Sequence, residues 1–366
     1  MILEHLSVIG YRNVSQANLD LCPKINCFAG LNGAGKTTLL DAVYYLSFCK
    51  SSLGATDTAL TAHGMDGFMI QGQYRTGSQN ESGVVTVSAG YQQNRRKHFS
   101  LNRKEYSRYS DHIGVIPLVV SSPYDLDLIG GASADRRKFM DMIISQYDKE
   151  YLSALIGYTH ALEQRNAMLR DGQTDADLYA AVEYNMEIHA NVIYGKRCAF
   201  VEKLVPLFGE CYSAIGADTE NVAVGYLSCM SQGGLCAQLE QSRPKDIILG
   251  YTSKGVHRDD LEMTLGGFAV RKEASQGQKK SFLIALRFAQ YRILKQLCNT
   301  EPILLLDDLF DKLDDRRVSN IVKLVSGDDF GQIFITDTIS DRLDGMLEKY
   351  CGGEYRLFVV ENGTVK

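Results

Sequence analysis

One stretch of this chain has the residue types and spacing that bind phosphate groups. It reads Gly30-Leu31-Asn32-Gly33-Ala34-Gly35-Lys36-Thr37 and matches the pattern G-x-x-x-x-G-K-[ST] at every fixed position. Glycines let the backbone turn tightly, so that its N–H groups approach phosphate oxygens. In this pattern the Lys36 ammonium reaches the outer phosphates of a nucleotide, and the Thr37 hydroxyl can ligate Mg²⁺.

The sequence on either side supplies the elements that such a loop needs. Residues Ile25–Ala29 can form a strand, and apolar residues at 39, 42, 43 and 46 repeat at helical spacing. Strand, glycine loop and helix is the order of a phosphate-binding loop, in which the helix directs the positive end of its dipole at the anion. The alternative is a glycine-rich turn with an incidental lysine.

A second segment could bind an anion at the start of a helix. Ser275-Gln276-Gly277-Gln278 precedes apolar residues at 282, 286, 289, 293 and 297, and a hydroxyl and a glycine at a helix N-terminus favour phosphate. Because the first loop already holds one nucleotide, this segment predicts a sensor of the γ-phosphate, supplied within the chain or by a second copy. The alternative is an ordinary serine cap.

Two acidic residues follow an apolar run near the end of the chain. Asp307 and Asp308 come directly after the predicted strand Ile303–Leu306. A carboxylate at that position can hold Mg²⁺, and its neighbour can orient or deprotonate an attacking water. A second apolar run, 332–335, ends in Thr336-Asp337-Thr338, where a residue could sense the γ-phosphate. An Asp-rich turn is the alternative for the acid pair alone, but the three motifs together predict an ATP-binding domain.

Composition limits the classes of protein that the chain can belong to. It has 366 residues, 45% hydrophobic and 23% charged, with a net charge of −5, so any contact with nucleic acid must be a local basic patch. The nine cysteines include no C-x-x-C pair, which favours free thiols in a reducing cytosol. The N-terminus does not resemble a signal peptide, and no apolar run approaches 18 residues, so we expect a cytoplasmic protein without a membrane span.

The middle of the chain changes from strands to helices and back. Residues 68–120 carry strand signals, including a hairpin loop at Thr76–Gly83. The run 95–108 holds six Lys/Arg against one acid, with aromatic residues between them, so it is either a phosphate-contacting surface or a solvated hairpin face. From about 130 to 210 the apolar spacing predicts long helices broken at 171–175, and strand character resumes at about 222 and over 247–272.

In order, these motifs resemble the ATPase set of ABC-type proteins, with Leu313-Asp314 at the D-loop position after the two acids. Their separation by an inserted lobe resembles the heads of SMC proteins. The resemblance is closer to the bacterial RecF family, and covers nearly the whole chain. It rests on Tyr11-Arg12-Asn13, the phosphate loop, Ser122-Pro123-Tyr124-Asp125-Leu126, the segments 134–141 and 162–167, His257-Arg258-Asp259-Asp260 and Ala274-Ser275-Gln276-Gly277-Gln278.

This resemblance implies an α/β fold, namely an ABC-type ATPase head with a mixed sheet and an inserted, mainly helical lobe. We expect an N-terminal ATPase part over 1–125, a helical lobe over 126–245 and a C-terminal ATPase part over 246–366. The residues implied to bind ATP are Gly30, Asn32, Gly33, Gly35, Lys36, Thr37 and Thr38, with Arg12 near the nucleotide and Ser275 and Gly277 at the γ-phosphate held by a second protomer. Thr37 and Asp307 are implied as Mg²⁺ ligands, and Lys36 and Asp308 as catalytic residues.

The resemblance also implies a function in recombinational repair. Proteins of this family are cytoplasmic ATPases that form a homodimer around two ATP molecules and bind double-stranded DNA or gap junctions while dimerised. With RecR and RecO they help RecA to load on single-stranded DNA, and hydrolysis, stimulated by DNA, releases the DNA. Thr38 and Asp41 stand where the family usually has Asn and Glu. The segment Thr336-Asp337-Thr338 has no switch histidine of the kind found in transporter ATPases. We therefore expect slow hydrolysis.

Two other functions use the same motifs. A nucleotide-binding subunit of a transporter would have a shorter lobe between the loop and the signature, and a histidine after the second strand. A structural SMC-like head would need coiled-coil arms of hundreds of residues, whereas residues 133–209 allow only a short arm.

Overall fold

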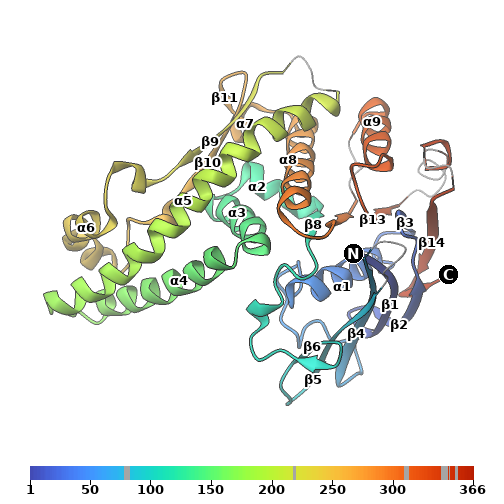
Figure 1. The fold of residues 1–366 in the computed structure, drawn as a ribbon, viewed down its shortest axis with the longest axis horizontal. Helices are drawn as coiled ribbons and strands as arrows, with labels where there is room; N and C mark the ends of the chain where they lie inside the picture. The colour runs from blue at the N-terminus through green and yellow to red at the C-terminus, as the bar shows by residue number, and fades with distance from the viewer. Residues whose placement is uncertain (78–82, 217–219, 309–312, 339–344, 346, 351–352) are drawn as a thin grey trace. The chain divides into compact units, whose positions relative to one another are not determined.

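The structure is a computed structural model of residues 1–366. It describes all of them except 78–82, 217–219, 309–312, 339–344, 346 and 351–352, and the predicted hairpin loop at Thr76–Gly83 lies mostly outside the described residues. The chain forms two compact units (Figure 1). Unit 1 comprises Met1–Asp125, Cys211–Asp218 and Leu283–Lys366, and unit 2 comprises Leu126–Glu210 and Thr219–Phe282.

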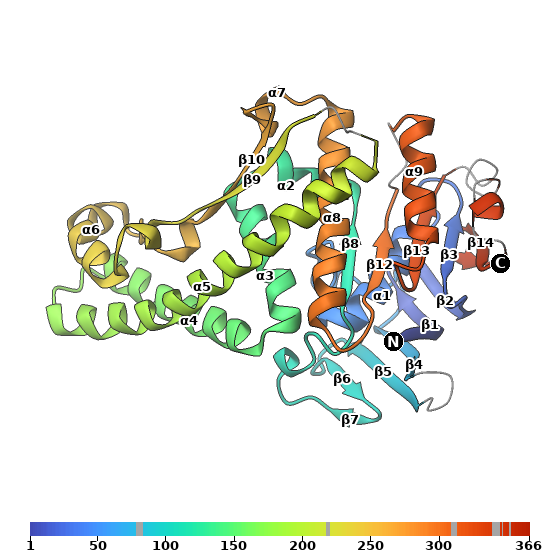
Figure 2. The ribbon, with the colours of Figure 1, turned by 45° about the horizontal axis from the view of Figure 1, so that its top comes forward.

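Unit 1 contains two six-stranded sheets. The first is antiparallel, in the order β2-β1-β4-β5-β6-β7. Its strands are β1 (Ile2–Tyr11), β2 (Val14–Asp20), β4 (Gly67–Thr76), β5 (Gly83–Gln92), β6 (His98–Leu101) and β7 (Lys104–Glu105). The second has the order β15-β14-β3-β13-β12-β8 (Figure 2). Its strands are β3 (Ile25–Ala29), β8 (Leu118–Ser121), β12 (Ile303–Leu306), β13 (Ile333–Asp337), β14 (Tyr355–Glu361) and β15 (Thr364–Val365).

The second sheet is parallel except at its β14–β15 edge, so it is mixed, as predicted. Every residue of β3 and β12 is buried, which is why these strands read as unbroken apolar runs. Helix α1 (Lys36–Phe48) is buried along almost its whole length because it touches strands of both sheets. Parallel strands align their carboxyl ends, so the ends of β3, β12 and β13 are brought to one edge with the start of α1.

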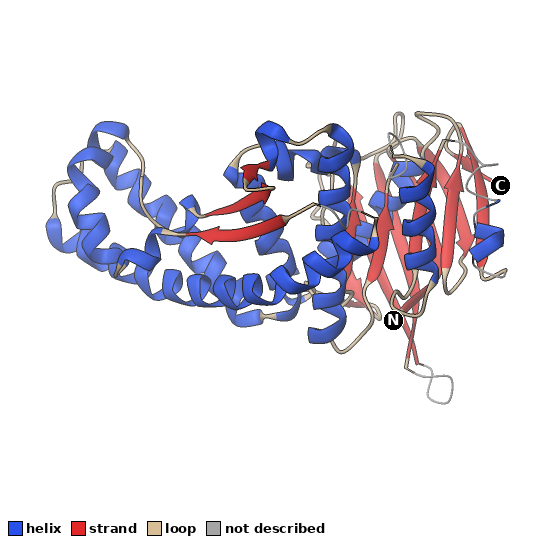
Figure 3. Cartoon of the chain, turned by 90° about the horizontal axis from the view of Figure 1, so that it is seen from above, coloured by secondary structure: helices blue, strands red, loops and turns tan. Residues whose placement is uncertain are grey.

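Unit 2 is mainly helical (Figure 3). Its helices are α2 (Leu126–Gly130), α3 (Ser133–Tyr147), α4 (Lys149–Arg170), most of α5 (Ala176–Ala214), α6 (Leu235–Leu249), α7 (Val270–Glu273) and the start of α8 (Gln276–Leu297). A small antiparallel sheet runs β11-β10-β9, with β9 at Val222–Leu227, β10 at Asp260–Leu265 and β11 at Phe268–Ala269. The predicted break at 171–175 falls between α4 and α5, which lie side by side (Figure 1).

The unit boundaries differ from the predicted segments after the helical lobe. One boundary falls between Asp125 and Leu126, but Cys211–Asp218 belongs to unit 1, residues 246–282 lie in unit 2, and the chain returns to unit 1 at Leu283. The reason is strand pairing: β10 pairs along its whole length with β9 of the same unit. The prediction of strands over 247–272 is confirmed only for β10 and β11. Residues 247–249 end helix α6, 256–258 form a 3-10 turn, and 270–272 belong to α7. Among the described residues, no helix has the length and apolarity to cross a membrane.

A fully buried arginine holds the far end of the helical lobe together. The Arg165 guanidinium donates to Glu183 at 2.9 Å, to Asp246 at 2.8 Å and to the Thr252 hydroxyl at 2.9 Å. These contacts join α4 to α5, α6 and the loop that follows α6. The next residue, Asn166, accepts hydrogen bonds from the backbone N–H and hydroxyl of Thr252. The segment 162–167 is therefore a structural feature of the lobe.

A second buried arginine acts in the same way nearer to β10. Arg197 on α5 donates to Asp259 at 2.6 Å and to Asp141 at 2.8 Å, and it is 2% exposed. Arg136 on α3 forms a two-point ion pair with Asp260. The segments 134–141 and 257–260 thus meet in the folded unit, and their charges neutralise one another in the interior.

Candidate functional site

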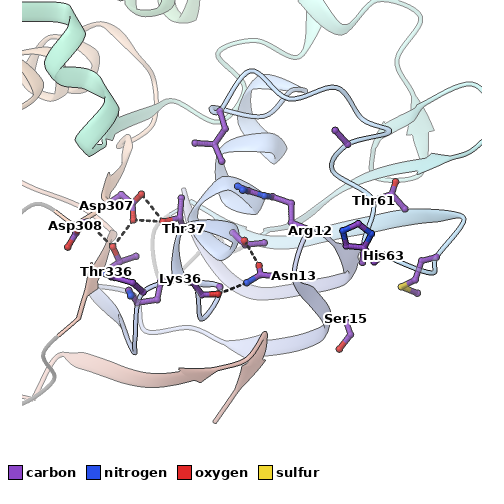
Figure 4. A pocket seen from close by; sticks show the side chains of 18 residues that line it. Arg12, Asn13, Ser15, Lys36, Thr37, Thr61, His63, Asp307, Asp308 and Thr336 are labelled. Carbon is purple, nitrogen blue, oxygen red and sulfur yellow. Dashed lines mark hydrogen bonds between the residues drawn. The ribbon is translucent and has the colours of Figure 1, made fainter. Parts of the chain in front are cut away.

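The carboxyl-end edge of the second sheet opens into a cavity of about 850 Å³ within unit 1 (Figure 4). It is lined by Arg12, Asn13, Ser15, Asn32, Gly33, Gly35, Lys36, Thr37, Thr38, Leu53, Ala59, Thr61, Ala62, His63, Met65, Asp307, Asp308 and Thr336. Most of the predicted site residues of unit 1 are therefore in one place, although the two acids are about 270 residues from the phosphate loop in the sequence. Of the predicted set, Ser275 and Gly277 belong to unit 2.

The phosphate loop has the backbone conformation that its glycines permit. Gly33 and Gly35 have φ angles of +82° and +119°, in the left-handed region that side-chain-bearing residues avoid. Gly30 does not line the cavity but lies directly against β14, where a methyl group in its place would be 2.3 Å from the Val360 carbonyl oxygen. Gly35 is the residue before the first turn of α1, so the unpaired N–H groups of that turn face the cavity.

Lys36 extends over the loop from which it comes. Its ammonium group donates to the carbonyl oxygens of Gly30 at 2.7 Å and Leu31 at 3.0 Å. Burial lowers the pKa of Lys36, and the nearby carboxylates of Asp308 and Asp307 oppose that shift. The loop thus holds a positive charge in a partly desolvated position, where an anion would be attracted strongly.

Asp307 lies at the end of β12 and joins this strand to the first turn of α1 and to β13. Its carboxylate accepts hydrogen bonds from the Thr37 hydroxyl at 3.0 and 3.1 Å and from the Thr336 hydroxyl at 2.7 Å. Burial raises the pKa of Asp307, although the two hydroxyl donors counteract that effect. Hydroxyl and carboxylate oxygens are the ligands that Mg²⁺ prefers, so Thr37 and Asp307 fit a magnesium ion.

Asp308 is held beside that pair in an unusual backbone conformation. Its φ angle is +47°, which costs free energy for a residue other than glycine, and such strain clusters at functional sites. Its backbone N–H donates to the Thr336 hydroxyl at 2.8 Å. Thr336 therefore fixes both acids. The sequence indicated only that one of residues 336–338 could sense the γ-phosphate, so this contact with both acids is revealed by the fold.

The turn between β1 and β2 contributes Arg12 and Asn13. The Nη1 atom of Arg12 is buried without a hydrogen-bond partner, and Figure 4 shows the side chain within the cavity. Asn13, which was not predicted as a site residue, donates to the Gly33 carbonyl oxygen at 2.9 Å and accepts from the Thr38 hydroxyl at 2.6 Å. An unpaired buried donor is costly, so Arg12 is placed to bind an acceptor that enters the cavity.

The far wall of the cavity comes from the segment after α1, which supplies Ala59, Thr61, Ala62, His63 and Met65. The Arg12 backbone N–H donates to the Leu60 carbonyl at 2.7 Å, and the Ala62 N–H donates to the Gly10 carbonyl at 2.8 Å. This attachment to β1 presents the side chains of Thr61, His63 and Met65 to the cavity. No periodicity or motif marks the segment, so only the fold reveals it.

Asp41, where the sequence departs from the usual family residue, is buried behind the loop. Its carboxylate accepts hydrogen bonds from Tyr11, Ser51 and Ser52. The shorter side chain is thus fully satisfied by neighbouring hydroxyl groups and a backbone N–H, and Asp41 supports the start of the cavity wall.

Ser275 has the geometry of a helix cap within unit 2. The backbone N–H of Gln278 donates to the Ser275 hydroxyl at 3.2 Å, and the Gln278 side chain accepts from the Ser275 N–H at 2.8 Å. This reciprocal pair is a capping box. The cap is the alternative left open by the sequence, and a phosphate contact by the same hydroxyl remains a prediction.

Comparison with known proteins gives the chain its relatives. The model of the RecF/RecN/SMC N-terminal domain matches residues 2–365. The DNA replication and repair protein RecF of Phocaeicola vulgatus is 51% identical, over 100% of this chain and 98% of the relative. RecF of Bacteroides thetaiotaomicron is 48% identical over the same shares. The chain belongs to the RecF family.

Solved structures agree with this assignment. One solved structure is described as the recombination mediator protein RecF-ATP in the RecFOR pathway. It is 26% identical to this chain, with a TM-score of 0.87, and the match covers 100% of this chain and 97% of that one. The Smc head domain of Pyrococcus furiosus is 16% identical with a TM-score of 0.58 over all of this chain and 95% of that one, which shows a shared fold alone. The family resemblance and the ABC-type, SMC-like fold predicted from the sequence are confirmed.

Proposed function

We propose that this chain binds ATP with Mg²⁺ in the cavity of unit 1 and hydrolyses it to control binding to DNA during recombinational repair. The observation that carries the proposal is the convergence of Lys36, Thr37, Asp307 and Asp308 on one cavity, which also contains the unpaired Arg12 donor. The proposal is supported by the family, whose member in the RecFOR pathway is described with ATP.

The arrangement of the cavity suggests the orientation of the nucleotide. Figure 4 shows the two acids at one end and His63 at the other, with Arg12 between them. The γ-phosphate must face the acid that handles the attacking water, so the ribose and base extend toward His63 and Met65. A mixed wall of this kind suits a base, because the imidazole offers stacking and hydrogen bonding while the thioether packs against a flat ring.

Each residue then has a distinct task in hydrolysis. The loop amides and Lys36 bind the phosphate oxygens, and Arg12 adds a second cation. Thr37 and Asp307 would hold Mg²⁺, which neutralises negative charge on the phosphates when bound. Asp308 orients the attacking water and accepts its proton as the new oxygen–phosphorus bond forms and the bond to the departing ADP oxygen breaks.

We propose further that ATP joins two copies of this chain and that the dimer binds double-stranded DNA. Ser275 and Gly277 would contact the γ-phosphate held by the second copy, and RecR, with RecO and RecA, would act on the assembled dimer. The run 95–108 is the proposed DNA surface: Arg95, Arg96 and Arg103 are exposed. Lys97 is not part of it, since its ammonium lies 4.4 Å from the centre of the Tyr45 ring and 3.4 Å from Asp57.

Titration calorimetry with Mg-ATP and with inorganic triphosphate tests the nucleotide site. Lys36→Ala should weaken binding of both by about 10- to 100-fold, because a lost charge-assisted hydrogen bond costs roughly 1.5–3 kcal/mol. His63→Ala should weaken ATP binding and leave triphosphate binding unchanged, since it lies at the base end. Lys50→Ala, at an exposed lysine just past α1, is the control. Equal binding of ATP by Lys36→Ala and the wild type would refute the proposal.

A further inference from the structure

The last hairpin of the chain lies directly against the phosphate loop. Strand β14 pairs in parallel with β3, so that Val359 is the register partner of Ala29, the residue before the loop. The hairpin turns at Asn362 and Gly363, since Glu361 pairs with Thr364 across a two-residue connection. Both turn residues have positive φ angles, +49° and +77°, as the tight turn between twisted strands requires.

Three backbone contacts join this hairpin to the nucleotide site. The Gly363 N–H donates to the Ala34 carbonyl oxygen, inside the phosphate loop, at 2.8 Å. A methyl group in place of the Gly363 hydrogen would lie 1.9 Å from the Asn13 carbonyl oxygen, and one on Gly30 would lie 2.3 Å from the Val360 carbonyl oxygen. Glycine is therefore needed on both sides of the contact, because backbone meets backbone there.

Asn13 connects the two sides of this arrangement. Its backbone carbonyl rests on Gly363, while its side chain bonds the Gly33 carbonyl and the Thr38 hydroxyl, on either side of Lys36. Displacing the turn at Gly363 would thus shift Asn13 and release Ala34 at the same time. Both changes act on the backbone whose N–H groups face the cavity.

We propose that the turn at Asn362 and Gly363 is a positioning element of the nucleotide site, which holds the phosphate loop and the turn at Asn13 in the conformation that binds phosphate. The inference rests on the proposed ATP site. Since phosphate recognition by backbone N–H groups needs their directions to be fixed in advance, a loosened loop loses affinity although every side chain in the cavity is unchanged.

Two glycine substitutions separate positioning from backbone strain. Gly363→Ala places a methyl group where the Asn13 carbonyl lies, in a residue with φ of +77°. Gly353→Ala changes a glycine with φ of +92°, also close to β14 in the sequence, around which a methyl group would meet no atom within 4 Å. Both variants of the full chain should lose thermal stability through unfavourable φ. Only Gly363→Ala should lose affinity for Mg-ATP, by about tenfold or more.

The outcomes are distinct. If the wild type binds Mg-ATP and both variants bind it equally well, or both lose affinity to the same extent, the hairpin has no positioning role and the inference fails. If the wild type itself does not bind Mg-ATP, the proposed function fails instead. Should Gly363→Ala not fold, amide hydrogen exchange of the wild type decides the matter: Mg-ATP should slow exchange at Gly363 and Lys366 but not in the β9–β10 pair, and unchanged exchange at Gly363 would overturn the inference.

Discussion

At the scale of single residues, Asp307 carries opposing demands of stability and function. It is 5% exposed, and its pKa is raised by burial. The folded state binds the proton of such a carboxyl group more tightly than the unfolded state does. The free energy of unfolding therefore falls as the pH rises from the pKa of the unfolded chain to that of the folded protein. Near neutral pH the ionised Asp307 therefore opposes folding until a cation neutralises it.

Asp307→Asn should accordingly stabilise the protein near neutral pH while it weakens Mg²⁺-dependent ATP binding. We expect a rise in melting temperature of about 2 °C or more, and the gain should shrink below about pH 4, where the aspartate of the unfolded chain also holds its proton. Asp308→Asn makes the same chemical change next to it, at a more exposed position, and serves as the control. Melting curves across this pH range without Mg²⁺ measure the effect. A lower melting temperature for Asp307→Asn at neutral pH would contradict it.

The sequence predicted the residues whose type alone defines their chemistry. Lys36, Thr37, Asp307 and Asp308 belong to short motifs, so their roles could be expected before the fold was known. Asn13 and Thr336 could not be assigned in this way, because an amide or a hydroxyl acquires its role only from the groups that the fold places around it.

At the scale of elements, Arg165 decides the integrity of the helical lobe. Its side chain is fully buried and its partners Glu183 and Asp246 are 3% and 0% exposed.

The long helices α4 and α5 were predictable because their buried residues repeat at helical spacing. Helix α6 was not, since its buried residues are only Leu235, Leu239 and Asp246, which leaves no apolar stripe.

Arg165→Met should destabilise the lobe strongly. Removing the guanidinium leaves the buried Asp246 carboxylate without its cation, while Glu183 keeps Arg243 at 2.6 Å. Such a loss typically costs about 3–5 kcal/mol. Lys196→Met provides the matched comparison: Lys196 also bridges two acids, Asp148 and Glu150, but it is 36% exposed, so its loss should cost about 1 kcal/mol or less. Urea unfolding followed by circular dichroism gives both values. Similar midpoints for the two variants would show that the Arg165 cluster does not hold α6 in place.

At the scale of the whole molecule, the motifs of the site come together only through the sheet. Strands β3, β13 and β12 are neighbours although they lie at residues 25–29, 333–337 and 303–306. Motif order predicted that these parts would cooperate, and the family resemblance predicted the mixed sheet that brings them together. The point at which the chain leaves the second unit could not be predicted, because the pairing of β9 with β10 spans more than 30 residues that contain a helix of weak pattern.

The proposed cycle makes the assembly depend on ATP and its release depend on hydrolysis. Variants of the full chain separate the steps. Ser275→Arg should bind ATP as a monomer and fail to dimerise, because the larger side chain would meet the nucleotide held by the second copy.

Reversing the charge of Arg95, Arg96 and Arg103 should leave the ATP-dependent dimer intact while it weakens DNA binding and flattens the salt dependence of that binding.

The most direct test is the mass of the protein–DNA complex, measured by light scattering on double-stranded DNA with ATP, with ADP and without nucleotide. We predict that dimers form on DNA only when ATP is present, and not with ADP or without nucleotide. We also predict that dimers of the Asp308→Asn variant stay on the DNA after the wild type has hydrolysed its ATP and dissociated. Monomers on DNA in all three conditions, or an Asp308→Asn variant that leaves as fast as the wild type, would contradict the account.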